Sequence, residues 1–518
     1  MSYVVNVDVG TGSGRAIAFD EDGRQIAISQ REWLPKTDPR YPGAQDFDTA
    51  NAWQLLSECL RDVVGQIGAR KSSIAAVTST SMREGMVLYD QRGREIWACP
   101  NVDGRAGDEA VEMMRRGMAD RIYETGGDWL GIISPPRFWW IRNHAPDTFR
   151  QIAKMNMLND WVLYRLSGEF CTTPSSGSSS GIFDLRKRVW AEPLIHDIEL
   201  PEGIYPPVVE SGTRVGVVTS VAAGQTGIPA GTPVIAGGAD TQMALVGAGL
   251  VNPGAFTVCA GTFWQTALVA DTPLIDPQRR PRTLCHAVPG QWMTEGIGFY
   301  HGFTMRWFRD GFCDLERQEA EKRGVDAYTV MEERARSVPP GSNGVHGIFS
   351  NVMEAKRWRH GPPSLVGFNL LDAAGTGKAA CIRAIEENAA YVTRGHLEIL
   401  KELSKQSPEE IVFMGGASKG FLWPQIVADV TGVALRIPVV KETTSLGGAI
   451  AGFRSIGVFD SWAQAASAVV RTERMVEPKP DAVRAYDEAY ARWRRVTDRM
   501  VAMADDRVLP PLWRAPGA

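Results

Sequence analysis

The most constraining feature of this chain is a glycine-rich segment between two strand-like runs. Residues 4–29 read VVNVDVGTGSGRAIAFDEDGRQIAIS, and the β-rich runs on either side of the glycines both predict strands. A P-loop requires G-x-x-x-x-G-K-[ST], which the sequence lacks, and a dinucleotide-binding fingerprint requires a helix after its glycines. The sequence therefore predicts a β-hairpin with Gly10, Gly12 and Gly14 in its turn and Asp8 at its mouth.

This hairpin resembles the phosphate-binding hairpin of actin-like ATPases. Backbone N–H groups and a hydroxyl, from Thr11, Gly12 and Ser13, would then face phosphate oxygens, and the Asp8 carboxylate would hold magnesium, often through water. An ordinary tight hairpin is the alternative, so the interpretation depends on further segments of the chain.

Three further glycine loops follow strand-like runs. Gly237-Gly238-Ala239-Asp240 precedes a helix-like run, Gly261-Thr262 follows the run FTVC, and Gly415-Gly416 lies between a strand-like and a helix-like run. An actin-like ATPase has two similar halves that close on the nucleotide, and these loops occur in both halves of the chain. We therefore predict a two-domain α/β fold of the actin-like ATPase (ribonuclease H-like) class, with the active site in the interdomain cleft.

The boundary between the two domains is expected near 247–254, where the chain becomes rich in glycine and proline. Residues 1–247 would form the substrate and phosphate side. Residues 248–518 would form the adenine-nucleotide side.

Composition and charge limit the classes of partner and the cellular compartment that we expect. The 518 residues carry a formal net charge of −4, which gives no electrostatic reason for a nucleic-acid or anionic-membrane partner. The 7 cysteines include no C-x-x-C pair, which argues against a zinc site or a disulfide framework and for a reducing compartment. The first residues do not resemble a signal peptide, and no apolar run approaches the about 20 residues of a membrane-spanning helix. We therefore expect a cytoplasmic protein.

The order of these segments resembles that of the FGGY family of carbohydrate kinases, which includes glycerol kinase and xylulokinase. DVGTGSGRAIAFDEDG is similar to the family's first phosphate motif, GGADTQMALVGAG to its catalytic-aspartate motif and AGTFWQ to its second phosphate motif. MGGASKGFLWPQIVADVTG, followed by VKETTSLGGAIAG, is similar to its adenosine segment. ISPPRFWWIRNH resembles its N-terminal signature, with Arg137 where lysine is usual and Ile132 where an aromatic or small residue is usual. The resemblance extends over nearly the whole chain and implies a kinase that uses ATP and Mg²⁺.

The resemblance implies that Asp240 is the catalytic base. A small alcohol is a poor nucleophile at neutral pH, and a positioned carboxylate can accept its proton as the bond to the γ-phosphorus forms. An aspartate that begins a helix can also act as an N-cap, and both roles can hold together. Asp8 resembles the family's magnesium-linked aspartate, and the alternative is a turn aspartate that accepts hydrogen bonds from backbone N–H groups.

Phosphate and adenosine contacts are implied at the remaining loops. Thr11, Arg15 and Thr262 would reach phosphate through a hydroxyl, a guanidinium and loop N–H groups, although an arginine on a hairpin can simply be solvated. The adenosine contact falls on the loop that begins at Gly415, where glycine lets the backbone approach a base or ribose closely. An ordinary strand-to-helix turn is the alternative there. The expected nucleotide contacts are Thr11, Gly12, Ser13, Arg15, Gly261, Thr262, Gly415, Gly416 and Ser418.

Substrate recognition is expected first from the run SMREG. Arg83 only donates hydrogen bonds and Glu84 only accepts them, so the pair can bracket the hydroxyls of a polyol or hydroxyketone. The pair is similar to the substrate pair of glycerol kinase, and a surface charge pair is the alternative.

The run NVDGR and the residues after the second phosphate loop complete the expected pocket. Asp103 and Arg105 either contact the substrate or form a salt bridge behind the site. Ile132, Trp264 and Gln265 would shape the pocket away from glycerol. The expected substrate-binding residues are Arg83, Glu84, Asp103, Arg105, Asp240 and Gln265.

Four runs are not generic for the FGGY family and resemble only a part of it: SMREGMVLYD, IWACPNVDGRA, GFTMRWFRDGFC and LWRAPG. The resemblance they carry implies phosphorylation of the terminal hydroxyl of a small linear hydroxy-carbonyl compound, 4,5-dihydroxy-2,3-pentanedione, in quorum-sensing signal processing. A sugar or polyol kinase for a pentulose, erythritol or glycerol is the alternative. A nucleotide-dependent chaperone or filament protein is a third hypothesis, which the base and the hydroxyl-binding pair argue against. A homodimer and a regulator from the sugar-phosphotransferase system stay open as partners.

Overall fold

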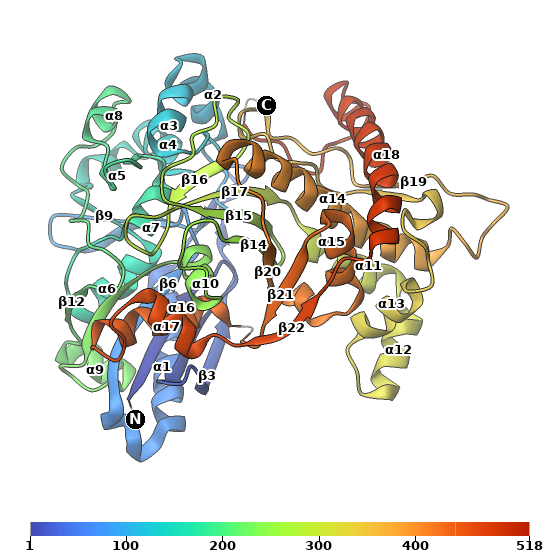
Figure 1. Cartoon of the computed structure of the whole chain (residues 1–518). Coiled ribbons are helices and arrows are strands. Elements are labelled where there is room, and N and C mark those ends of the chain that lie inside the picture. Colours follow the sequence, from blue (N-terminus) through green and yellow to red (C-terminus); the bar gives the residue numbers. More distant parts are fainter. Residues whose placement is uncertain (1, 441, 517–518) are drawn as a thin grey trace.

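A computed structural model of the chain, which describes residues 2–440 and 442–516, contains two large β-sheets surrounded by helices (Figure 1). The first sheet has the strand order β12-β13-β6-β1-β2-β3 and the second the order β16-β17-β15-β14-β20-β21-β22. The first sheet comprises β1 (Tyr3–Val9), β2 (Ser13–Asp20), β3 (Gln25–Glu32), β6 (Ile74–Ser81), β12 (Arg214–Val217) and β13 (Pro233–Ala239). The second comprises β14 (Phe256–Ala260), β15 (Trp264–Ala270), β16 (Arg282–Cys285), β17 (Trp292–Gly298), β20 (Glu410–Met414), β21 (Ala434–Pro438) and β22 (Thr472–Val476).

The predicted N-terminal hairpin is confirmed as β1 and β2. The two strands pair antiparallel, with Asp8 opposite Arg15, and the Gly10 N–H donates to the Ser13 carbonyl at 2.8 Å to close the turn. All of β1 is buried because β6 pairs with it in parallel on the other side. A strand in the centre of a sheet is apolar on both faces, which explains its run of valines.

The glycine loops of the second sheet meet at one edge. β14 and β20 are parallel neighbours with Cys259 opposite Met414, so the loops that begin at Gly261 and Gly415 leave the sheet side by side. Gly415 has φ +99°, and a Cβ there would lie 2.7 Å from the Ala260 carbonyl oxygen. Only glycine fits this close approach between the two loops.

Helix α16 (Thr443–Ser455) connects the second half of the chain to the first sheet. It packs on β1, β6 and β13 and crosses α10 (Asp240–Gly247) at contact distance. A Cβ on Gly247 or on Gly447 would lie 1.9 Å from a backbone oxygen of the opposite helix, so both positions need glycine. The segment that sequence alone assigns to the second domain thus supplies a helix that covers the first sheet.

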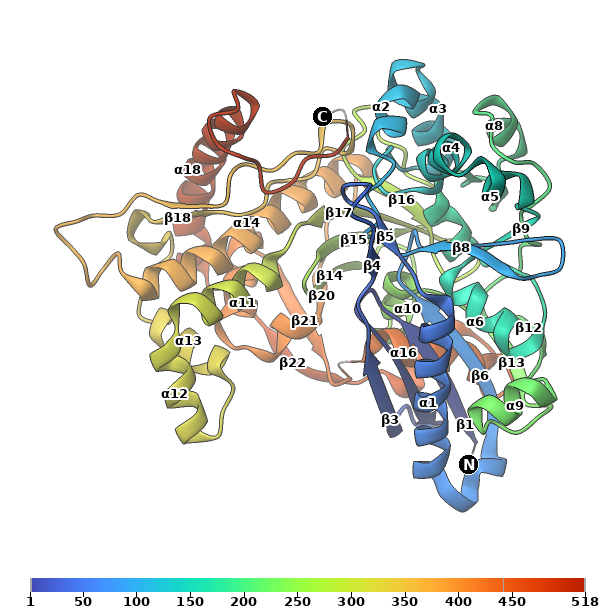
Figure 2. The same cartoon turned by 180° about the vertical axis from the view of Figure 1, so that it is seen from behind.

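The remaining helices form the outer layers. Residues 105–170, which are rich in tryptophan, include α2 (Gly107–Arg115), α3 (Met118–Gly126), α4 (Ser134–His144) and α6 (Leu158–Ser167). Trp139 and Trp161 are buried there as core residues. From behind, Figure 2 shows α14 (Lys378–Ser404) and α18 (Pro480–Asp505) on the side of the second sheet that faces away from the first sheet. Within the residues described, no helix has the length and apolar character required to cross a membrane.

Candidate active site

Asp240 begins α10 at the end of β13, where two glycines bring the chain close to its neighbours. A Cβ on Gly237 would lie 1.9 Å from the Ser79 oxygen, and one on Gly238 would lie 2.4 Å from Ser175 Oγ. Asp240 Oδ1 accepts hydrogen bonds from the N–H (2.6 Å) and the hydroxyl (3.2 Å) of Thr241. The N-cap position itself is Ala239. The Asp240 carboxylate therefore retains acceptor capacity for a ligand.

The electrostatic surroundings of Asp240 suit a base. Burial raises the pKa of Asp240 to about 6, the negative charges of Asp8 and Glu84 add to this, and Arg83 and the Thr241 N–H oppose it. The side chain keeps partial exposure because it faces a cavity. A carboxylate with a pKa near 6 is ionised at neutral pH and still binds a proton more readily than an ordinary aspartate.

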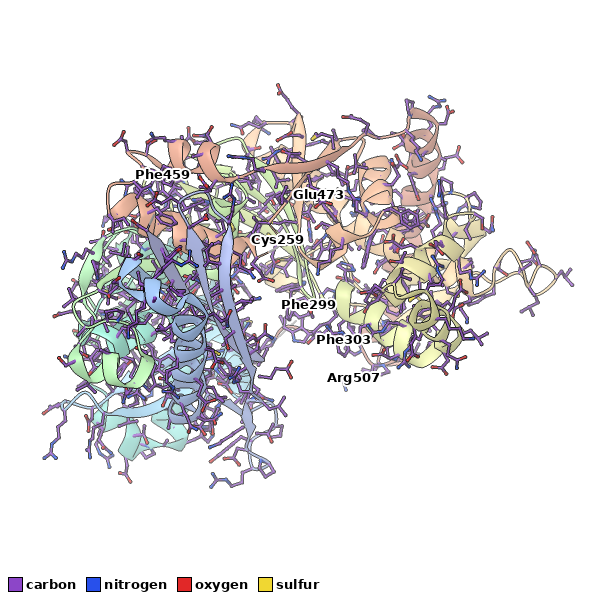
Figure 3. All side chains as sticks on the ribbon, turned by 90° about the horizontal axis from the view of Figure 1, so that it is seen from below. Cys259, Phe299, Phe303, Phe459, Glu473 and Arg507 are labelled. Atoms are coloured by element: carbon purple, nitrogen blue, oxygen red, sulfur yellow. The ribbon has the colours of Figure 1, made fainter. Side chains whose placement is uncertain are left out.

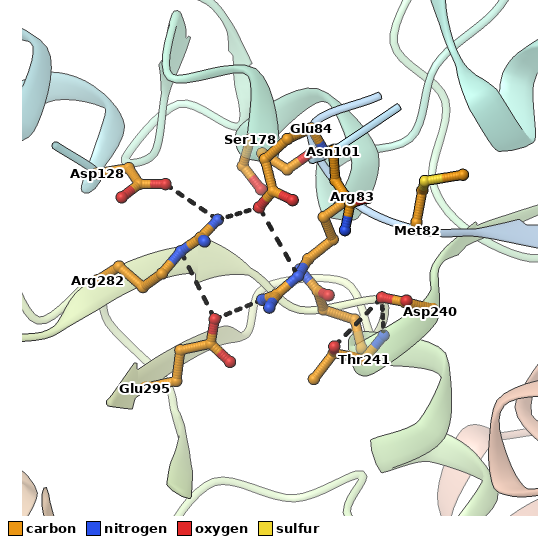
Figure 4. Close-up of polar contacts among 12 residues, drawn as sticks. Met82, Arg83, Glu84, Asn101, Asp128, Ser178, Asp240, Thr241, Arg282 and Glu295 are labelled. Carbon is orange, nitrogen blue, oxygen red and sulfur yellow. Dashed lines mark hydrogen bonds and ion pairs between the residues drawn. The ribbon is translucent and has the colours of Figure 1, made fainter. Parts of the chain in front are cut away.

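The predicted pair Arg83 and Glu84 belongs to a buried cluster of five charged side chains (Figure 4). Arg83 Nη1 donates to Glu295 Oε1 at 2.5 Å, and its Nε lies 3.9 Å from Glu84 Oε1. Arg282 Nη2 lies 2.6 Å from Glu84 Oε1 and 3.0 Å from Asp128 Oδ2. Each arginine thus lies between carboxylates, which offsets the cost of burying the charges.

Sequence reasoning missed three members of this cluster. Arg282 and Glu295 come from β16 and β17 of the second sheet, and Asp128 follows α3. Burial raises the pKa of Asp128 to about 6, with Arg282 opposing the shift and Glu84 adding to it. No motif marks these residues, because their partners lie far away in the sequence.

Arg137, which stands where the family usually has lysine, connects the backbone at Glu84 with residues 100–103. Its guanidinium is buried and donates to the carbonyl oxygens of Glu84, Pro100, Asn101 and Asp103. A lysine has too few donors in the right directions to hold two loops in this way. Glu84 itself has a left-handed φ of +60°, a conformation that the surrounding bonds must maintain.

A cavity of about 280 Å³ brings many of the predicted residues together. Its lining includes Thr11, Arg83, Glu84, Asp240 and Gln265 among the predicted residues, together with Ile132. Figure 3 shows Phe299, another lining residue, on the side of the second half that faces the first half.

Three residues predicted for the pocket, Asp103, Arg105 and Trp264, lie outside this lining. Arg105 Nε donates to Asp103 Oδ1 at 2.7 Å, and the guanidinium lies over the rings of Trp97 and Trp140. Asp103 and Arg105 thus have the geometry of the second alternative, a salt bridge behind the site. Trp264 is buried away from the cavity, and its Nε1 donates to the Thr393 hydroxyl. Successive residues of a strand face opposite sides, so Gln265 lines the cavity and its neighbour Trp264 does not.

The hairpin places the ion pair of Asp8 and Arg15 near Asp240. Asp8 Oδ2 accepts from Arg15 Nε at 2.9 Å, Asp8 Oδ1 accepts from the Thr80 hydroxyl at 2.8 Å, and Arg15 Nη1 pairs with Glu442 at 2.5 Å. Burial lowers the pKa of Arg15, but the charges of Asp8 and Glu442, the hydrogen bond to Asp8 and the charge of Asp240 together outweigh burial and raise this pKa.

The loops expected to bind ATP differ in how much room they leave. A Cβ on Gly12 or Gly416 would meet nothing within 4 Å, so the backbone there is open to a ligand. Thr11 Oγ1 donates to Asn101 Oδ1 at 2.9 Å, and Ser13 begins β2. Gly261 and Thr262 lie against Gly302 of α11 (His301–Phe312). Ser418 is turned inward, since its hydroxyl donates to the Gly415 carbonyl at 2.7 Å.

The residues fit a magnesium ion that is held mainly by phosphate oxygens. The described residues contain no group of three or more His, Cys, Asp or Glu side chains that would form a protein cage for a metal. The Asp8 carboxylate is buried beside the hairpin and near Asp240. One carboxylate, phosphate oxygens and water form a normal set of Mg²⁺ ligands.

Comparison with known proteins identifies the family and the fold. A family model described as the N-terminal domain of the FGGY family of carbohydrate kinases matches residues 3–247, and the model of its C-terminal domain matches residues 257–456. Proteins named autoinducer-2 kinase from Salmonella paratyphi A and Escherichia coli K12 are 41% and 42% identical, each over 99% of this chain and 98% of the relative. The crystal structure of xylulose kinase from Rhodospirillum rubrum matches with a TM-score of 0.83 and 24% identity, over 96% of this chain and 98% of that chain. These matches confirm the predicted fold class.

Proposed function

This chain belongs to the FGGY family of carbohydrate kinases, and from that premise we propose that it transfers the γ-phosphoryl group of ATP to the terminal hydroxyl of autoinducer-2 in its linear form, 4,5-dihydroxy-2,3-pentanedione. The full-length relatives named autoinducer-2 kinase support this substrate. The observation that carries the proposal is the cavity in which Asp240, Arg83, Glu84 and Gln265 meet. In quorum-sensing signal processing, the added charge would retain the molecule inside the cell.

Asp240 acts as the general base in this proposal. Its carboxylate accepts the proton of the terminal hydroxyl while the oxygen forms a bond to the γ-phosphorus and the bond from that phosphorus to the ADP oxygen breaks. The products are ADP and a phosphate monoester, and the proton on Asp240 is released to water.

Arg83 and Glu84 orient the substrate. The Arg83 guanidinium donates to substrate oxygens and the Glu84 carboxylate accepts from a hydroxyl, as expected for neighbouring hydroxyl and carbonyl groups. Glu295 and Arg282 hold these two side chains in place through the contacts at 2.5 Å and 2.6 Å. A preorganised pair loses little entropy when substrate binds.

The glycine loops would bind ATP. The β1–β2 turn at Thr11, Gly12 and Ser13 and the loop at Gly261 and Thr262 would hold phosphates through backbone N–H groups and hydroxyls. The open backbone at Gly416 would lie against the adenosine. Mg²⁺ beside Asp8 would supply charge compensation for the phosphates, while Arg15 would add a positive charge on the same side.

A coupled assay of ADP release tests the proposal directly. The purified full chain is given ATP, Mg²⁺ and one of 4,5-dihydroxy-2,3-pentanedione, D-xylulose, erythritol or glycerol. We expect the diketone to have the highest kcat/KM. A higher kcat/KM for xylulose, erythritol or glycerol would replace the proposal with the sugar or polyol kinase. ADP release that does not depend on any acceptor would contradict both.

We also propose that the protein acts in the cytoplasm. The 7 cysteines are all free thiols, which suits the reducing cytoplasm where ATP is available. The homodimer and the sugar-phosphotransferase regulator stay predictions.

A further inference from the structure

The C-terminal segment 509–516 folds back onto the cavity after α18 ends. It runs antiparallel to residues 358–361: the His360 N–H donates to the Trp513 carbonyl at 2.8 Å and the Ala515 N–H to the Trp358 carbonyl at 2.7 Å. Figures 1 and 2 both place this end of the chain near α2, above the two sheets. Arg514 pairs with Asp505 of α18 at 2.9 Å. The segment is therefore held at several points along its length.

Trp513 joins an aromatic wall that the second half of the chain forms around the cavity. Its ring stacks on Phe299 at 4.7 Å and meets Trp358 edge-on at 5.1 Å, and Phe299 also contacts Trp358 and Phe263. Trp513 and Ala515 both line the cavity that contains Asp240. The last described residues of the chain are thus part of the wall of the substrate cavity.

The charged and aromatic walls are connected along one strand. Glu295, Ile297 and Phe299 are spaced two residues apart, the first two in β17 and the third just after it. Their side chains therefore face the same side of the sheet. Glu295 contacts Arg83, Phe299 contacts Trp513, and Ile297 lies between them opposite Gln265 of β15. A linear molecule in this cavity therefore meets charge at one end and aromatic rings at the other.

We propose, on the basis of the function proposed above, that the segment 509–516 is a wall of the substrate cavity and that Trp513 is a specificity-determining residue. The terminal hydroxyl of the substrate faces Asp240, and the methyl ketone end packs against Trp513 and Phe299. A sugar or polyol of similar length carries a hydroxymethyl group at that end. The rings of Trp513 and Phe299 have no acceptor oxygen, so burying this hydroxyl against these two rings removes its hydrogen bonds to water. The aromatic wall thus favours the diketone over such substrates.

Trp513→Ala tests this role, with Trp513→Phe as the conservative variant and Val508→Ala as a matched control. Val508 is 62% exposed and lies just before the segment. The readouts are kcat and KM for 4,5-dihydroxy-2,3-pentanedione, D-xylulose and ATP. We expect Trp513→Ala to lower the ratio of diketone to xylulose kcat/KM by about tenfold to hundredfold, mainly through a higher KM for the diketone, and to leave the KM for ATP unchanged. Trp513→Phe should keep most of the preference, and Val508→Ala should keep all of it.

The outcomes separate this inference from the proposed function. An equal loss of activity on both substrates, or an unchanged ratio, would overturn the role of Trp513. A chain truncated after residue 508 provides a second test, because it removes the wall without a new side chain, and it should lose the same preference while ATP binding survives. A wild-type enzyme that prefers xylulose would contradict the proposed function. If, in that case, Trp513→Ala also leaves the KM for xylulose unchanged, the role of the segment 509–516 as a wall of the cavity is overturned as well.

Discussion

Arg83 of the first half of the chain donates a hydrogen bond to Glu295 of the second half over 2.5 Å, although the two residues are 212 positions apart. The arginine expected to bind substrate is therefore held in place by the opposite half of the protein. A contact of this kind links substrate binding to the relative position of the two halves.

Glu295→Gln should weaken substrate binding and stability together. The variant keeps the shape of the side chain but leaves Arg83 and Arg282 with one carboxylate fewer in a buried site. We expect a loss of about 2–4 kcal/mol in the free energy of unfolding by urea, and a higher KM for substrate at unchanged KM for ATP. Glu402→Gln removes an exposed partner of Arg280 and should change neither quantity measurably. Wild-type stability and KM in Glu295→Gln would contradict the support that we assign to this contact.

Asp240→Asn should abolish phosphoryl transfer without loss of ATP binding. An amide cannot accept the proton of the hydroxyl, so we expect kcat to fall by about 10²–10⁴-fold. Calorimetric titration with ATP and Mg²⁺ measures the binding that should remain. Asp310→Asn, on the exposed surface of α11, is the control. Near-full turnover of Asp240→Asn would reject the base.

The pH dependence of kcat/KM should report the raised pKa of Asp240. The carboxylate must be ionised to act as a base, and burial raises its pKa from 3.8 to about 6. Activity should therefore fall with a slope of one as pH drops through about 6, well above the range of an exposed aspartate. A profile that stays flat down to pH 4.5 would show that no group of raised pKa is needed.

The same pKa shift predicts that the base destabilises the fold at neutral pH. A folded-state pKa above the unfolded value contributes stability that is full below the unfolded pKa and is lost as pH rises through about 6. Asp240→Asn should accordingly be more stable than the wild type at pH 8, by up to about 3 kcal/mol, and should match it near pH 4. Urea unfolding of both proteins at these two pH values measures the difference, and equal stability at pH 8 would contradict the shift.

Gly447→Ala should disturb the contact between α10 and α16 on which the position of Asp240 depends. The new Cβ would lie 1.9 Å from the Met243 oxygen, so the helices must separate. We expect a loss of about 3 kcal/mol or more in unfolding free energy and a lower kcat. Gly224→Ala in α9 (Ser220–Thr226) has nothing within 4 Å and should leave stability unchanged or raise it by about 0.5 kcal/mol. Thermal unfolding and ADP release measure both variants, and a Gly447→Ala protein with wild-type stability would contradict the close contact.

Several parts of the site were predictable from the sequence because they depend on local chain chemistry. Valines around Gly10, Gly12 and Gly14 predict a hairpin, and the glycines before Asp240 predict a tight strand-to-helix junction, because these conformations are set by neighbouring residues. Arg83 and Glu84 were predicted from the resemblance of the run SMREG to the family's substrate pair, which needs only adjacent residues.

Tertiary structure decided the rest. Nothing near Glu295, Arg282 or Asp128 in the sequence indicates that they meet Arg83 and Glu84, because that cluster forms only when strands of the second sheet reach the first half. The position of Trp513 in the cavity likewise depends on how the last helix packs and where the chain turns back. Local residues set local backbone conformation, whereas contacts between distant segments depend on the packing of whole elements, and this packing leaves no short pattern in the sequence.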